Sequence, residues 1–121
     1  MQIKKARDIN HKLPAGSKND YPYALSDKIF HTKQLFLYSE KVRPGTCASA
    51  PHTHTAIDEI IYVVSGSLVV VEGDEEKELS KGDSVCFQSG SEDKHYLENR
   101  SSIDAEFLIF RRSTQKNDVH Y

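Results

Sequence analysis

The chain has 121 residues, enough for one domain with a single core and too few for a second. Its 16 lysines and arginines nearly balance its 18 aspartates and glutamates and are scattered along the sequence, which argues against nucleic acid as a partner. The longest apolar run has five residues, far short of a membrane span, and the basic residues near Met1 precede no apolar signal segment, so we expect a cytoplasmic protein without a membrane partner.

The first 30 residues predict an N-terminal arm. They are polar, contain Pro14, Gly16 and Pro22, and show no sustained periodicity. We expect residues 31–121 to form the folded domain. The arm would then lie against this domain or against a neighbouring subunit.

Short runs typical of β-strands recur from residue 34 onward, with turn residues between them. No segment carries a convincing 3.6-residue apolar stripe longer than two turns, so we predict an all-β sandwich or barrel. Gly66, Gly73 and Gly82 supply the positive φ that tight reversals need. The predicted strands are Gln34–Lys41, Ser49–His54, Glu59–Val64, Ser67–Glu72, Glu76–Leu79, Ser84–Gln88, His95–Glu98 and Ala105–Arg111.

Two histidines, His52 and His54, lie two residues apart in the second of these runs. Because successive side chains of a strand alternate, both can point to one face and share a metal, although an exposed polar face would give the same pattern. Glu59 opens the next run and His95 begins a later one, so a carboxylate and a third imidazole are available. Asp58 is the competing carboxylate, but only one of two neighbours on a strand can face the interior.

Three imidazoles and one carboxylate form a borderline-to-hard site for one divalent cation. The carboxylate favours Mn²⁺ or Fe²⁺, whereas the imidazoles would also hold Ni²⁺, Zn²⁺ or Cu²⁺. An octahedral ion would keep two positions open for water or a substrate. We interpret His11, His31 and His120, which lie outside this pattern, as surface residues.

The last predicted strand is apolar on both faces, because Phe107 and Ile109 alternate with Leu108 and Phe110. One face fits a core. The other face then needs cover from a second sheet or from another subunit. We therefore predict a homodimer.

These residues resemble the two sequence motifs of the cupin family. The first motif, G-x5-HxH-x3,4-E-x6-G, corresponds to Gly45, His52, His54, Glu59 and Gly66, with one extra residue before His52. The second, G-x5-P-x-G-x2-H-x3-N, corresponds to Gly82, Gln88, Gly90, His95 and Asn99, with glutamine in place of proline and four residues instead of two before the histidine. The resemblance covers residues 35–111 and implies a double-stranded β-helix, the cupin jelly-roll barrel, with a metal held inside by His52, His54, Glu59 and His95.

The resemblance also implies a function. It favours a metal-dependent cupin that acts on an oxygen-rich small molecule, as a dioxygenase, decarboxylase or isomerase does. The alternative is a non-catalytic, metal-containing barrel that binds or senses a small molecule. The fold does not decide between them, and no catalytic residue is assigned. Gln34, Arg43, Gln88 and Arg111 are candidates for polar contacts in the pocket.

Overall fold

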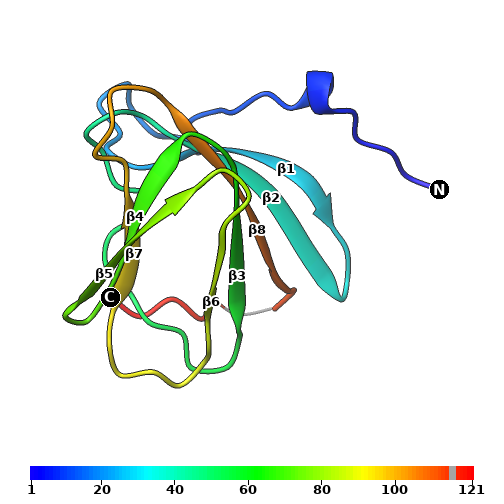
Figure 1. The fold of residues 1–121 in the computed structure, drawn as a ribbon. Helices are drawn as coiled ribbons and strands as arrows, with labels where there is room; N and C mark the ends of the chain where they lie inside the picture. Colours follow the sequence, from blue (N-terminus) through cyan, green and yellow to red (C-terminus); the bar gives the residue numbers. More distant parts are fainter. Residues whose placement is uncertain (115–116) are drawn as a thin grey trace.

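The computed structural model describes residues 1–114 and 117–121, and strands in two antiparallel sheets dominate this part of the chain (Figure 1). One sheet has the strand order β1-β2-β8-β3-β6, and the other has the order β5-β4-β7. The elements are η1 (Ala6–Asp8), a 3-10 helix, and β1 (Leu25–His31), β2 (Leu35–Val42), β3 (Glu59–Ser65), β4 (Ser67–Glu72), β5 (Glu75–Ser80), β6 (Ser84–Phe87), β7 (His95–Glu98) and β8 (Ala105–Arg112). The all-β prediction is confirmed. Within the described residues, no helix has the length and apolar character needed to span a membrane.

The hydrophobic core lies between the two sheets, where alternate residues of facing strands meet. On β3, Ile61 and Val63 are buried, whereas Ile60 and Tyr62 between them are exposed. This is the two-residue period of a strand with one face inward. Phe107 of β8 belongs to the same core, as its alternation predicted. The core residues are Ala24, Val42, Ile61, Val63, Leu68, Val70, Phe87, Leu97, Ala105 and Phe107.

Strand β1 was not predicted from the sequence and lies largely inside the segment assigned to the arm. It pairs with β2 from Leu25 opposite Lys41 to His31 opposite Phe36, with a shift of register on the way. Its side chains are at most partly buried, so it lacks the apolar alternation by which a strand is recognised. Backbone pairing with its neighbour holds it in the sheet. The division into an arm and a barrel domain stays a prediction. Strand β1, most of which lies within the predicted arm, belongs to the five-stranded sheet.

The predicted strand Ser49–His54 is wrong. The structure has bends there, followed by two isolated bridges that pair His52 with His95 and Thr53 with His120. Pro51 has no N–H to donate to a ladder, and the Ser49 hydroxyl hydrogen-bonds within its own segment. The other seven predicted strands are present, and each observed end lies within one residue of the predicted end.

Candidate metal centre

Four buried side chains converge inside the barrel, and they are the four predicted ligands. His52 and His54 come from the loop between β2 and β3, Glu59 is the first residue of β3, and His95 is the first residue of β7. Their exposed fractions are 8%, 3%, 4% and 3%. One ligand atom from each lies within 4.8 Å of those of the others. This spacing allows one ion to contact all four.

Backbone pairing brings these residues together. The main-chain groups of His52 and His95 exchange two hydrogen bonds, of 3.2 Å and 2.9 Å. The Gly90 amide donates to the His54 carbonyl oxygen at 2.8 Å, so the loop before β7 lies against the first two histidines. The two additional residues in that loop, relative to the second motif, therefore leave His95 in the cluster.

Two imidazole nitrogens inside the cluster, His54 Nε2 and His95 Nε2, face Glu59 and have no hydrogen-bond partner among the described residues. His54 Nε2 lies 3.1 Å from Glu59 Oε2, and His95 Nε2 lies 3.7 Å from Glu59 Oε1. Both nitrogens are buried, and neither makes a hydrogen bond of acceptable geometry. A buried polar atom without a partner is costly, and a cation between these atoms would supply the missing interaction. The cluster therefore suits a divalent metal.

The protonation of the cluster also fits a cation. Burial by itself raises the pKa of Glu59, but the imidazoles of His54 and His95 outweigh burial and bring this pKa down to about 2. Burial lowers the pKa of His52, which favours the neutral imidazole that binds metals. At His54, burial also acts to lower the pKa, but Glu59 and the Asp118 carbonyl raise it above the usual value. A metal must compete with a proton there.

Hydrogen bonds on the far side of two rings fix their orientation. His52 Nδ1 lies 2.8 Å from the Ala50 carbonyl oxygen, and His54 Nδ1 lies 3.0 Å from the Asp118 carbonyl oxygen. Because a carbonyl only accepts, each Nδ1 must carry the hydrogen and donate it. In the neutral ring, each Nε2 then has a free lone pair for a metal.

Asp118, close to the end of the chain, is part of this site and was not predicted. Its carboxylate accepts hydrogen bonds from the amides of Thr55, Ala56 and Ile57, at 3.1, 2.8 and 3.1 Å. The hydrogen bonds from the Thr55 hydroxyl and from the amides of Ala56 and Thr55 hold the pKa of Asp118 well below its usual value. The contacts clamp the C-terminal segment onto the histidine loop. No local pattern signals a contact between residues more than 60 positions apart.

Asp118→Ala should weaken metal binding about 10- to 100-fold, the usual effect of losing a partner outside the ligand shell. Without the carboxylate, the clamp opens and the carbonyl that orients His54 moves away. Titration with Co²⁺ against a chelator measures the affinity. Asp20→Ala, at an exposed aspartate, is the matched control. Equal affinity in the two variants would contradict the role of the clamp.

The cluster opens into a cavity of about 200 Å³. Apolar walls from Ile61, Leu97 and Phe107 enclose it, and Glu40 and Arg111 add charged groups. Arg111 was among the four predicted candidates for pocket contacts. The other three do not line this cavity: Gln34, Arg43 and Gln88. Glu40 was missed because no motif position corresponds to it.

Comparison with family models matches residues 38–111 to the cupin domain. A sugar phosphate isomerase of the cupin superfamily from Silicibacter pomeroyi has a similar structure, with a TM-score of 0.82, 23% identity, and coverage of 93% of this chain and 76% of that one. A polyketide cyclase from Streptomyces resistomycificus is also similar, with a TM-score of 0.80, 19% identity, and coverage of 99% of this chain and 84% of that one. For a predicted oxalate decarboxylase from Thermotoga maritima, the TM-score is 0.67 and the identity 23%, with coverage of 75% of this chain and 81% of that one. No curated protein matches the chain. At these identities the structures support the double-stranded β-helix fold.

Proposed function

The chain belongs to the cupin family, and on that premise we propose that it is a metal-dependent cupin that acts on an oxygen-rich small molecule. The observation that carries this proposal is the buried cluster of three histidines and one glutamate at the wall of a cavity. The similar structures support it, because they are named as an isomerase, a cyclase and a predicted decarboxylase.

In this proposal His52, His54, Glu59 and His95 hold one divalent cation, with Mn²⁺ or Fe²⁺ favoured and Ni²⁺, Zn²⁺ or Cu²⁺ as the other candidates. The cation would supply a Lewis acid to two adjacent oxygens of a hydroxy acid, enol or sugar derivative. The residues of the chain supply the surroundings. Glu59 contributes a fixed negative charge, and apolar walls that include Ile61 and Leu97 keep water from most of the ligand.

The test is a screen of chelating acids and sugars against the Fe²⁺, Mn²⁺, Ni²⁺ and Zn²⁺ forms, with products followed by NMR and oxygen consumption. We expect one ligand to disappear with time. Glu59→Gln should then lower turnover more than it lowers binding of that ligand, because it removes a charge from the ligand shell. Recovery of every ligand unchanged from all four forms would favour the alternative, a barrel that binds or senses its ligand.

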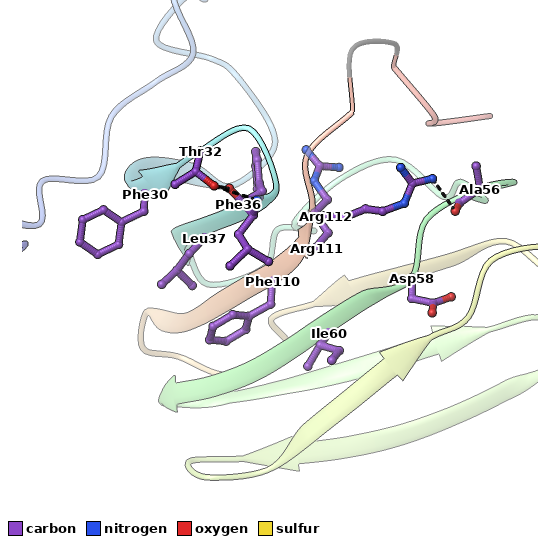
Figure 2. Close-up of a pocket in the computed structure, with 11 residues that line it drawn as sticks. Phe30, Thr32, Phe36, Leu37, Ala56, Asp58, Ile60, Phe110, Arg111 and Arg112 are labelled. Carbon is purple, nitrogen blue, oxygen red and sulfur yellow. Dashed lines mark hydrogen bonds between the residues drawn. The ribbon is translucent and has the colours of Figure 1, made fainter. Parts of the chain in front are cut away.

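We also propose that the protein is a homodimer. The outer face of the large sheet supports this, because Ile60, Tyr62 and Phe110 are 45%, 43% and 39% exposed there. A groove of about 580 Å³ on this face is lined by Phe30, Leu37, Ile60 and Phe110, whose side chains are drawn in Figure 2. An apolar face of this kind is typical of subunit contacts. The expectations of a cytoplasmic location and of no nucleic-acid or membrane partner stay predictions.

Light scattering should give twice the chain mass of 13.7 kDa. Ile60→Glu places a charge in the apolar face and should shift the protein to the monomer mass. Ile103→Glu is the control, because Ile103 is 62% exposed in the loop before β8 and lies outside this groove. A monomer mass for the unmodified protein would refute the dimer.

A further inference from the structure

One carboxyl group in the cavity lies outside the predicted ligand set. Glu40 belongs to β2, two residues before Val42, which is fully buried in the core. Residues two apart on a strand share a face, and Glu40 is paired with Phe107, another core residue. Its side chain therefore points into the barrel, where it lines the cavity together with the ligand cluster.

No other described residue satisfies this carboxyl group. Within residues 1–114 and 117–121, Glu40 receives no hydrogen bond. It is also absent from the cluster whose ligand atoms lie within 4.8 Å of one another. A carboxyl group that faces a cavity with neither a hydrogen bond nor a place among the ligands is available to whatever the cavity holds.

Burial and two charged groups on the same sheet set the proton affinity of Glu40. Its pKa is raised to about 8: burial is the largest cause, the negative charge of Glu59 on β3 adds to the rise, and the positive charge of Arg111 on β8 opposes it. A cation in the cluster would oppose it further. Such a group can both take up and release a proton near neutral pH, as a general acid–base catalyst must.

We propose that Glu40 is a catalytic acid–base residue, and that the substrate is a carbonyl compound with a hydrogen on the carbon next to the carbonyl group. This inference rests on the proposed function. The Glu40 carboxylate takes that hydrogen as a proton: an O–H bond forms, the C–H bond breaks, and its electron pair becomes the C=C bond of an enolate. Return of the proton to the same carbon restores both the carboxylate and the carbonyl compound. No oxidant, reductant or second substrate is consumed.

The position of Arg111 indicates that the substrate also carries a negative charge. Its guanidinium group lies 4.0 Å from the centre of the Phe36 ring, and it lines the same cavity as Glu40. A cation held in this way favours an anionic group on the ligand. A 2-keto acid, with a carboxylate beside a ketone, combines the anion, two adjacent oxygens and a removable proton.

Pyruvate is the probe. In D₂O, the Zn²⁺-loaded protein should exchange the pyruvate methyl hydrogens for deuterium faster than free Zn²⁺ does, as NMR would show. Glu40→Gln should slow this exchange about 100-fold or more, the scale of general acid–base catalysis. The variant should still bind Co²⁺ and still show the change that pyruvate causes in the Co²⁺ spectrum. Glu78→Gln, at an exposed strand position, is the control and should exchange at the normal rate.

A second measurement needs no metal. The infrared band of a protonated carboxyl group should persist at neutral pH in the metal-free protein and be absent from Glu40→Gln. Equal exchange rates in the protein and in Glu40→Gln would overturn the inference, and so would pyruvate binding without any exchange. Failure of the unmodified protein to bind Co²⁺ or Zn²⁺ would instead overturn the proposed function.

Discussion

Replacing His54 or His95 with alanine should remove the metal from the purified protein and leave its β fold intact. Each change deletes an imidazole whose Nε2 faces Glu59 in the buried cluster and makes no hydrogen bond among the described residues. Loss of a partner outside the ligand shell already weakens metal binding about 10- to 100-fold, so loss of a ligand should exceed that. The fold should persist because the apolar core between the sheets, rather than the ion, dominates stability in a domain of this length.

Elemental analysis measures the metal content, and circular dichroism measures the fold. His31→Ala is the matched control, since His31 is exposed and contacts the rings of Phe36 and Tyr38 instead of the cluster. It should keep its full metal content. Full stoichiometry in both His54→Ala and His95→Ala would refute the assignment of these ligands.

The choice between two neighbouring carboxylates shows what could be predicted from the sequence. Glu59 is 4% exposed and faces the cluster, whereas Asp58 is exposed and accepts a hydrogen bond from the Ser89 amide at 2.8 Å. Neighbouring side chains point to opposite faces at the start of β3, so only one of the two carboxylates can face the cluster. This alternation can be recognised from a few consecutive residues. The same rule placed Phe107 in the core, and it placed Phe110 on the outer face.

Features that depend on long-range backbone pairing left no local pattern. β1 is held by its register with β2 and has no buried face to show in its sequence. His52 and His54 reach the cluster from a loop, so they lie together because of backbone pairing with distant residues and not because they share the face of a strand. Asp118 and Glu40 enter the site through contacts with residues far away in the chain.

The glycine and asparagine that close the two motifs bind no metal in this assignment, and the structure gives them a mechanical role. Asn99 is fully buried, and its Nδ2 donates to the carbonyl oxygens of Val42 and Ile103, at 2.8 Å and 2.7 Å. It thereby ties the end of β2 to the loop before β8. Gly66 joins β3 to β4, and an added Cβ there would lie 2.7 Å from the Asp104 carbonyl oxygen.

Gly66→Ala should therefore destabilise the protein much more than Gly82→Ala. Both glycines have positive φ, +74° and +91°, so an alanine at either position adds strain of about 1–2 kcal/mol. Only at Gly66 does the methyl group also meet backbone atoms, which adds roughly 1–3 kcal/mol of overpacking. Gly82 has nothing within 4 Å of that position. Urea unfolding measures both free energies. Equal losses of unfolding free energy would mean that the backbone at Asp104 moves aside and that the positive φ alone requires glycine at position 66. A larger loss at Gly66 would show that this motif glycine sets how closely β8 approaches the β3–β4 turn.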